Sequence, residues 1–180
     1  MKSLMQLSHK YSCPEGGRGD KGTTHTYIDW YEKLFEPLKN KYINLLEIGI
    51  YEGHSIKMWE EYFTNKNTQI YGIDIDLSRI KFDFGVNTFI IEADGTKQMD
   101  FKQMDIIIED GSHQVEDQIK SFEIWKENLK DGGYYIIEDV ELKGEMYNFW
   151  LNWCKNNKCS LIDMRDIGKT SDNALIIYKK

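Results

Sequence analysis

Residues 106–140 read IIIEDGSHQVEDQIKSFEIWKENLKDGGYYIIEDV, and this stretch decides the fold class. It begins with one short apolar run and closes with another, and residues 115–129 between them carry apolar side chains at helical spacing. A strand, a helix and a second strand in this order are typical of a parallel sheet, whose strands are covered on both faces. The predicted inward side of the helix consists of Val115, Ile119, Phe122, Ile124, Trp125 and Leu129.

The same alternation extends along the chain. Strands are predicted at residues 44–50, 68–76, 86–94, 103–110, 132–140, 159–166 and 173–180, and helices at residues 25–40, 54–63, 115–129 and 145–157. Thr24 is the predicted N-cap of the first helix. We therefore predict a single α/β domain with a Rossmann-like, mostly parallel sheet over residues 25–180, preceded by a glycine-rich, charged loop or lid over residues 1–24.

Composition excludes several classes of protein. The chain has 180 residues, 41% of them hydrophobic, and a formal net charge of -7, so we expect neither a disordered chain nor a nucleic-acid-binding surface. No apolar run approaches the about 20 residues that span a bilayer, and the first residues lack the apolar core of a signal peptide. We expect a cytoplasmic protein without a membrane partner, whose three cysteines have no functional role.

Acidic residues follow the predicted strands at their carboxyl ends. In open α/β sheets these ends share one rim, and ligands bind beyond it. The sequence therefore predicts a carboxylate-rich site on this rim, made of Glu47, Asp74, Asp94, Asp110, Glu138 and Asp139.

The first predicted strand leads into a glycine turn, EIGIYEGHS, over residues 47–55. Gly49 and Gly53 allow a tight turn before a helix, but the spacing is not the G-x-G-x-x-G of dinucleotide sites. Glu47 beside the turn would repel a pyrophosphate and suits a cation, such as an amino group or a sulfonium. Asp74 is placed to accept hydrogen bonds from ribose hydroxyls, and Asp94 to contact adenine.

These motifs carry a family resemblance. LLEIGIYEGHS, IYGIDID and DIIIEDGSH resemble class I S-adenosylmethionine-dependent methyltransferases. DKGTTHTYIDWYEKLFEPL, DGSH and GGYYIIED are more narrowly similar to the metal-dependent O-methyltransferases that modify the deoxysugars of macrolide antibiotics. The resemblance covers about residues 20–139 and implies a seven-stranded sheet with helices on both faces, closed by a hairpin formed by residues 159–180.

The resemblance also implies site residues. Asp110, Glu138 and Asp139 are expected to bind Mg²⁺ or another divalent cation, which prefers carboxylate oxygens. His113 and Asp110 are the expected catalytic residues, with His113 as the general base. The expected cofactor, S-adenosyl-L-methionine, would contact Lys21, Glu47, Gly49, Tyr51, Gly53, Ser55, Asp74 and Asp94. His25 and Tyr27 match the family's stretch that folds over cofactor and substrate, and we assign them to the lid.

The expected reaction is methyl transfer to a sugar hydroxyl, in which a divalent cation lowers the hydroxyl pKa and a neutral imidazole takes the proton. We expect no counterpart of the family's large N-terminal region, and residues 95–103 are too short for the usual helix. We expect an open site for a glycan or a glycosylated acceptor, in a homo-oligomer or a module of a larger enzyme.

Two alternatives remain open from the residues alone. A catechol-type O-methyltransferase would also use magnesium, although residues 110–117 read DGSHQVED rather than that family's D-x-x-K-x-x-Y. A non-catalytic S-adenosylmethionine-binding module would keep the turn but perform no reaction. The sequence does not name the acceptor sugar, its hydroxyl, the metal or the oligomeric state.

Overall fold

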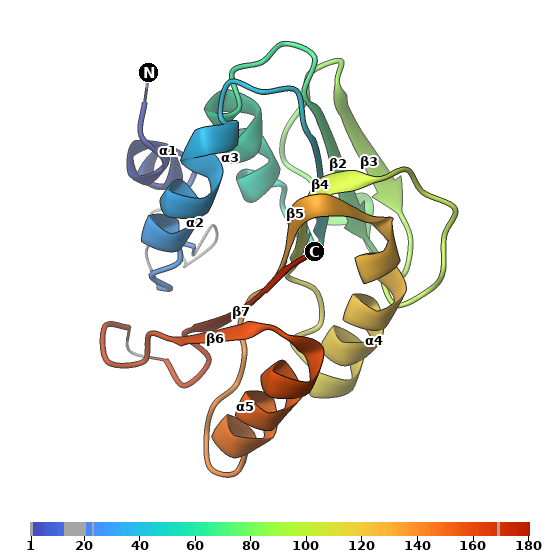
Figure 1. Cartoon of the computed structure of the whole chain (residues 1–180). Helices are drawn as coiled ribbons and strands as arrows, with labels where there is room; N and C mark the ends of the chain where they lie inside the picture. The colour runs from blue at the N-terminus through green and yellow to red at the C-terminus, as the bar shows by residue number, and fades with distance from the viewer. Residues whose placement is uncertain (1, 13–20, 23, 169) are drawn as a thin grey trace.

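The computed structural model describes residues 2–12, 21–22, 24–168 and 170–180, which form one seven-stranded sheet. The strand order is β3-β2-β1-β4-β5-β7-β6 (Figure 1). β1 to β5 run parallel, and β7 pairs antiparallel with both β5 and β6. The expected parallel sheet with its closing hairpin is confirmed. The strands are β1 (Asn44–Ile48), β2 (Gln69–Asp74), β3 (Thr88–Glu92), β4 (Met104–Glu109), β5 (Leu129–Ile137), β6 (Ser160–Asp163) and β7 (Ala174–Lys179).

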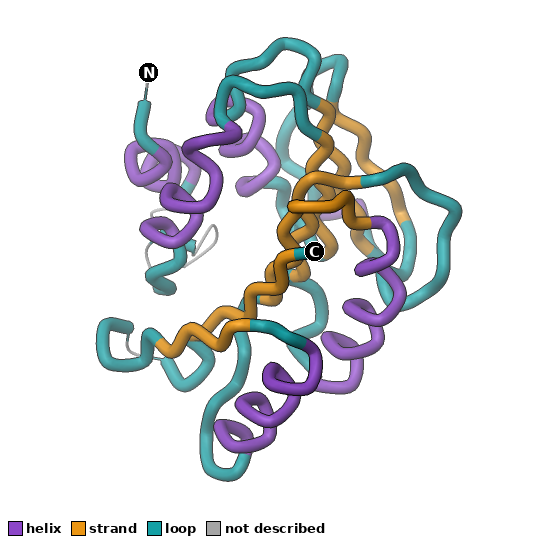
Figure 2. The backbone as a smooth tube through the Cα atoms, in the orientation of Figure 1, coloured by secondary structure: helices purple, strands orange, loops and turns teal. Residues whose placement is uncertain are grey.

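Helices cover both faces of the sheet, as the tube view shows (Figure 2). The helices are α1 (Leu4–Tyr11), α2 (Ile28–Phe35), α3 (His54–Tyr62), α4 (Val115–Trp125) and α5 (Met146–Asn157), with single 3₁₀ turns at Glu36–Leu38, Leu77–Arg79 and Lys126–Asn128. α1, α2 and α3 lie together on one side of the sheet, and α4 and α5 lie on the other (Figure 1). Among the described residues, no helix is long and apolar enough to cross a membrane.

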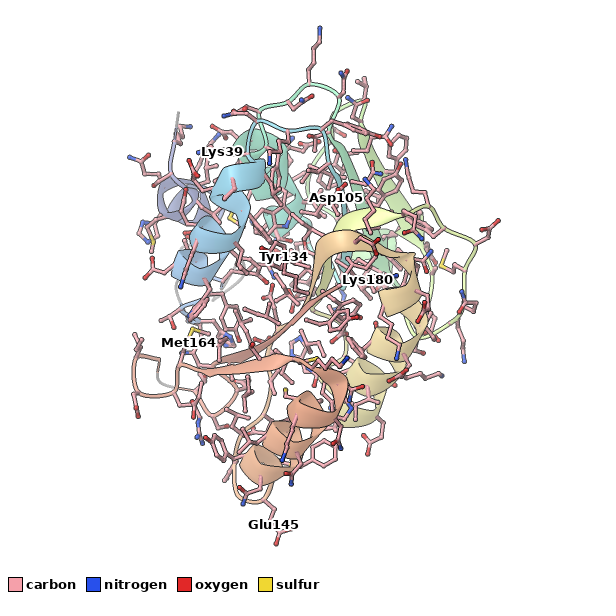
Figure 3. The ribbon with its side chains drawn as sticks, in the orientation of Figure 1. Lys39, Asp105, Tyr134, Glu145, Met164 and Lys180 are labelled. Atoms are coloured by element: carbon pink, nitrogen blue, oxygen red, sulfur yellow. The ribbon has the colours of Figure 1, made fainter. Side chains whose placement is uncertain are left out.

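Each helix layer has its own apolar cluster against the sheet. Tyr31, Phe35 and Trp59 belong to the cluster under α1, α2 and α3, and Phe122 and Trp125 belong to the cluster under α4 and α5. Side chains fill the space on both sides of the sheet, and the labelled Tyr134 packs against the first cluster (Figure 3).

Successive residues of β4 alternate between the two clusters. Ile106 and Ile108 pack in the first cluster, whereas Ile107 packs in the second. This alternation is the two-residue repeat of an extended strand. The same alternation determines towards which face of the sheet Glu109 and Asp110 point at the end of β4.

The structure corrects three local predictions. Residues 4–11, predicted as part of a loop, form α1, whose start has a capping box between Ser3 and Gln6. α2 begins at Ile28 with Tyr27 at the N-cap position and no side-chain cap, so Thr24 does not cap it. β5 begins at Leu129, earlier than predicted: Leu129 pairs with Met104, and after an irregularity the pairing continues between Tyr134 and Ile106.

Other predictions about the helices have mixed outcomes. No helix forms between β3 and β4, as the length of residues 95–103 predicted. On α4, Phe122 and Trp125 are buried, but Val115, Ile119 and Ile124 are only partly buried. Gln118 and Ser121 are buried instead, because each finds a polar partner inside: Glu138 for Gln118 and Tyr135 for Ser121.

Candidate active site

The acidic residues lie at the carboxyl ends of the strands, as the rim prediction required. Glu47 is the penultimate residue of β1, Asp74 ends β2, and Asp110 directly follows β4. Glu138 and Asp139 directly follow β5. Because β5, β4, β1 and β2 are neighbours in the sheet, these residues line one continuous edge.

The glycine turn brings the ends of β1 and β4 together. Gly49 has φ +83°, and a Cβ at this position would lie 1.9 Å from the Asp110 carbonyl oxygen. Gly53 has φ +85°, and its Cβ would lie 2.7 Å from the Phe84 ring. Only glycine fits this conformation and this close approach. The turn therefore needs Gly49 to place Asp110 beside it.

Asp74 stabilises the same turn from β2. Its Oδ2 accepts hydrogen bonds from the backbone amides of Ile50 at 2.9 Å and Tyr51 at 2.8 Å. Its Oδ1 accepts the amide of Asp76 at 3.1 Å. Tyr51, at φ +46°, leaves its ring 40% exposed above the turn.

A cavity of about 340 Å³ opens beside this turn. Three predicted cofactor residues, Gly49, Asp74 and Asp94, line it. Lys21, Glu47, Tyr51, Gly53 and Ser55 are not among its lining residues. The wall also includes the apolar Ile48, Ile73, Ile75 and Ala93 and the polar Thr96, Glu109, Ser112, Asp117 and Ser121.

Next to the turn, Lys21 joins carboxylates from three strand ends, which we call the Lys21 cluster: Lys21, Glu47, Asp110 and Glu138. Lys21 Nζ lies 2.6 Å from Asp110 Oδ2, 2.7 Å from Glu138 Oε1 and 3.2 Å from Glu47 Oε1. The Lys21 side chain is only 5% exposed, and that of Glu138 1%. A buried carboxylate requires such a cation, because its charge is otherwise poorly solvated.

The electrostatics of the Lys21 cluster follow from burial. Burial raises the pKa of Glu138 well above its usual value, with repulsion from Asp110 and Asp139 adding to the shift and Lys21 opposing it. Burial also raises the pKa of Glu47. Asp110 is different: burial acts upward, but Lys21 and His113 outweigh it and hold the pKa of this carboxyl below its usual value.

Two aromatic residues of the predicted helices at residues 25–40 and 54–63 also hold members of the Lys21 cluster. Tyr31 donates a short hydrogen bond to Glu138 Oε1, and Trp59 Nε1 donates to Glu47 Oε2 at 2.8 Å. Their helical spacing predicted burial correctly but gave no sign of these polar contacts. Partners 107 and 12 residues apart meet only through the tertiary fold.

His25 and Tyr27, which precede α2, contact the Asp139 carboxylate. Its Oδ1 accepts a hydrogen bond from the Tyr27 hydroxyl at 2.6 Å and lies 2.7 Å from His25 Nδ1. Tyr27 is fully buried and His25 is 4% exposed. We predicted lid and substrate roles for these two residues, but in the structure they contact Asp139 and present almost no surface to a substrate.

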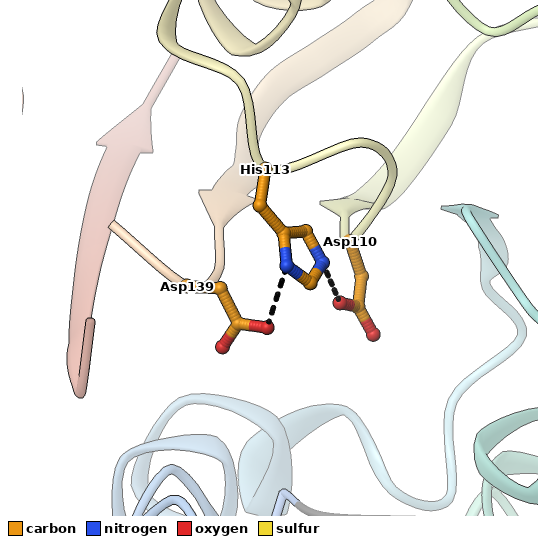
Figure 4. A group of neighbouring side chains, drawn as sticks. All are labelled: Asp110, His113 and Asp139. Carbon is orange, nitrogen blue, oxygen red and sulfur yellow. Dashed lines mark hydrogen bonds and ion pairs between the residues drawn. The ribbon is translucent and has the colours of Figure 1, made fainter. Parts of the chain in front are cut away.

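His113 bridges Asp110 and Asp139 (Figure 4). Its Nε2 lies 3.2 Å from Asp110 Oδ1, and its Nδ1 lies 3.3 Å from Asp139 Oδ2. The hydrogen bond to Asp110, partly offset by burial and reinforced by the charges of Asp110 and Asp139, raises the His113 pKa to about 9. The side chain is 42% exposed, so the ring is also accessible from solution.

The grouping of possible metal ligands differs in part from the predicted set. Asp110, His113 and Asp139 each offer one ligand atom, and these atoms lie within 4.8 Å of one another. Glu138, the third predicted ligand, directs its carboxylate to Lys21 and Tyr31 instead. Asp110 belongs to both arrangements, because one of its oxygens contacts Lys21 and the other contacts His113. Hard carboxylate oxygens on one rim suit a divalent cation such as Mg²⁺.

Comparisons with known proteins agree with the fold. No protein-family model matches the chain. It is 33% identical over 135 residues to the 8-demethyl-8-alpha-L-rhamnosyl tetracenomycin-C 2'-O-methyltransferase of Streptomyces olivaceus, covering 68% of this chain and 35% of the relative. It is 29% identical to the mycinamicin VI 2''-O-methyltransferase of Micromonospora griseorubida, covering 76% of this chain and 36% of the relative. The chain thus spans about a third of the length of the curated relatives that it matches.

A solved structure extends the likeness to nearly the whole chain. The MycE methyltransferase of the mycinamycin pathway, in complex with Mg, SAH and mycinamycin VI, superposes with a TM-score of 0.74. The superposition covers 99% of this chain and 54% of that one, at 24% sequence identity. At this identity the likeness concerns the fold.

Proposed function

Because this chain belongs to the class I S-adenosylmethionine-dependent methyltransferases, we propose that it transfers a methyl group from S-adenosyl-L-methionine to a sugar hydroxyl. The acceptor would be a glycan or a glycosylated small molecule, like those in the names of the relatives. One observation carries the proposal. Asp110, which packs against the cofactor turn at Gly49, also contacts His113, so a candidate base lies next to the cofactor cavity.

The cofactor proposal rests on the turn and the cavity. Gly49, Asp74 and Asp94 line a space of about 340 Å³, a size that suits a small cofactor. Glu47 and the other carboxylates of the Lys21 cluster lie behind the turn, where negative charge favours a sulfonium. We further propose that Lys21, Glu47, Tyr51, Gly53 and Ser55 support the methionine end.

We propose that Asp110, Glu138 and Asp139 hold the divalent cation. The support is that Asp110 and Glu138 already direct oxygens at a single cationic atom, Lys21 Nζ, and that Asp139 reaches Asp110 through His113. A bound Mg²⁺ would lower the pKa of the acceptor hydroxyl. These carboxylates would also orient the acceptor next to the cofactor cavity.

His113 would take the proton from the acceptor hydroxyl. With Asp110 and Asp139 facing it, the ring has a pKa of about 9 and is protonated at neutral pH. The negative charges of Asp110 and Asp139 raise the His113 pKa. A cation bound to these carboxylates would offset their charge, so the His113 pKa would fall towards its ordinary value. A base needs a pKa near the working pH. The charge on these two carboxylates therefore determines whether His113 can accept a proton.

The curated relatives are longer than the part that matches this chain, and their additional residues bear on how an acceptor is bound. We propose that the chain works as part of a larger assembly, either as one module or as a homo-oligomer. We propose that the short connection between β3 and β4, which forms no helix, leaves room for a bulky glycan.

The test is methyl transfer from radiolabelled S-adenosylmethionine to a panel of deoxysugar glycosides, with Mg²⁺ and with EDTA. We expect transfer with Mg²⁺, loss of transfer with EDTA, and at least a hundredfold loss for His113→Ala. His9→Ala, an exposed histidine on α1, is the matched control and should retain activity. Transfer only to small catechols would contradict the sugar acceptor, and full activity of His113→Ala would contradict the proposed base.

A further inference from the structure

Glu109 is a buried carboxyl that belongs neither to the Lys21 cluster nor to the residues of the proposed reaction. The residue is 2% exposed and lines the 340 Å³ cavity. Its Oε1 accepts a hydrogen bond from the Gly111 amide at 3.2 Å. Its Oε2 has no hydrogen-bond partner among the described residues. A buried polar atom without a partner is costly, and a group bound in the cavity would supply the missing hydrogen bond.

Glu109 cannot serve the Lys21 cluster, because it lies on the opposite face of the sheet from Asp110. Ile107, two residues earlier in β4, packs in the cluster under α4 and α5, together with Tyr135. The pKa of Tyr135 is raised by burial first and then by the charge of Glu109, which agrees with this placement. Glu109 therefore belongs to the cavity and not to the proposed metal site.

The surroundings of Glu109 suit a flat ring with a polar edge. Ile48, Ile73 and Ala93 supply apolar wall around the cavity. Ser121 lines it as well, and its Oγ lies 3.0 Å from the Tyr135 hydroxyl. An aromatic base has apolar faces and hydrogen-bonding atoms only in its plane, so the apolar wall suits its faces and a polar atom such as Glu109 Oε2 suits its edge.

The segment after β3 lines the same cavity. A Cβ on Gly95 would lie 2.2 Å from Ile48 Cγ2, so this segment passes directly over the end of β1. Trp125 Nε1 donates to the Gly95 carbonyl at 2.7 Å and fixes the segment against α4. In the sheet, β1 lies between β2 and β4, so the cavity extends from Asp74 across Gly49 to Glu109. A ribose bound at Asp74 leaves the base within this space.

We propose that Glu109 Oε2 forms a hydrogen bond with the edge of the cofactor's purine and is a specificity-determining residue for the base. The inference rests on the proposed function, because it takes S-adenosylmethionine and its product as the occupants of the cavity. It assigns to Glu109 a role separate from that of Asp110, its neighbour in the chain. The carboxyl orients the base, whereas the Lys21 cluster and His113 face the other end of the ligand.

The experiment is calorimetric binding of S-adenosylhomocysteine to the wild-type chain, to Glu109→Met and to Glu109→Gln. We expect Glu109→Met, which keeps the volume but no hydrogen-bonding atom of comparable strength, to weaken binding about 10- to 100-fold. Glu109→Gln retains a hydrogen-bonding group and should stay within about fivefold of wild type. Glu116→Met, an exposed glutamate in the first turn of α4, is the matched control.

Base analogues identify the contact. S-inosylhomocysteine and the 3-deaza and 7-deaza forms of S-adenosylhomocysteine alter the polar edges of the purine in turn. If Glu109 contacts the base, at least one analogue should bind the wild type more weakly and show no further loss in Glu109→Met. Thermal unfolding of each variant verifies that the protein is folded.

The outcomes separate the two proposals. A wild-type chain that binds no S-adenosylhomocysteine overturns the proposed function, and with it this role of Glu109. A wild-type chain that binds, together with a Glu109→Met variant of equal affinity and equal base preference, overturns the role of Glu109 alone. Losses that are the same for every analogue in Glu109→Met also overturn the base contact.

Discussion

Tyr27 contacts Asp139 twice through one hydroxyl oxygen. The hydroxyl donates to Asp139 Oδ1 at 2.6 Å and accepts the Asp139 backbone amide at 3.2 Å. Asp139 has φ +52°, a conformation that is unfavourable for a residue with a Cβ. Tyr27 thus stabilises both the strained backbone and the carboxylate of a proposed metal ligand.

Tyr27→Phe removes this hydroxyl and leaves the ring in place. We expect a loss of about 1–3 kcal/mol in the free energy of unfolding, because the Asp139 amide and carboxylate lose a buried partner. We also expect weaker Mg²⁺ binding, measured by calorimetry. Tyr42→Phe, whose ring is 51% exposed, is the matched control. Unchanged Mg²⁺ affinity in Tyr27→Phe would contradict the positioning role.

Lys21→Met leaves the carboxylates of the Lys21 cluster without their cation. In the metal-free protein we expect a loss of about 3–5 kcal/mol in unfolding free energy, because buried charges remain unpaired. Added Mg²⁺ should restore part of this loss, and should raise the melting temperature of the variant more than that of the wild type. Lys2→Met, which removes an exposed ion pair with Glu61, is the control. Equal Mg²⁺ shifts in variant and wild type would count against metal binding at this cluster.

The His113 pKa of about 9 makes a prediction for the metal-free protein. Asp110→Asn should lower this pKa, because the hydrogen bond to Asp110 is its largest cause. The folded-state pKa lies above the ordinary value of about 6.5, so protonation of His113 favours the folded state. That contribution is complete below pH 6.5 and is lost as the pH rises towards 9.

Imidazole NMR in EDTA measures this directly, with the His113 signal assigned by its absence in His113→Gln. A wild-type transition near pH 6.5 that Asp110→Asn leaves unchanged would show that the Asp110 contact is not formed in solution.

Gly49→Ala tests the close approach of β1 and β4. Gly132 provides an unusually good control, because it also has positive φ, +79°, yet has nothing within 4 Å of the position of a Cβ. We expect Gly132→Ala to cost about 1–2 kcal/mol for the backbone conformation alone. Gly49→Ala should cost at least about 1–3 kcal/mol more, because its Cβ meets the Asp110 carbonyl. Chemical denaturation of both variants measures the difference, and equal losses would contradict the steric explanation.

The order of strands and helices could be predicted because apolar periodicity is a local property. Each run that became β1, β2, β4 or β5 contains a short apolar stretch, and the helix residues Trp59, Phe122 and Trp150 are buried, as helical spacing of apolar side chains predicts. On α5, however, Tyr147 and Leu151 are 37% and 47% exposed, so the aromatic character of that helix did not predict which side faces the core.

The polar contacts of the site could be predicted only in outline. That acidic residues gather on one rim follows from a parallel sheet. That Tyr27 meets Asp139, or that Lys21 meets Glu138, depends on how the stretch before α2 packs across the strand ends. The contacts of Glu138 with Lys21 and Tyr31 likewise follow from side-chain placement, which no spacing rule describes.

Glu109 and Asp110 are consecutive, yet each faces a different helix layer. Loss or gain of a single residue inside β4 would turn both side chains to the opposite faces of the sheet, so that Glu109 would leave the cavity side and Asp110 would leave the side of the Lys21 cluster. Substitution can alter one of these sites at a time, whereas a change of strand length would disable both together. Insertions and deletions should therefore be tolerated around Gly132, in the part of β5 that does not pair with β4, and rejected between Met104 and Glu109.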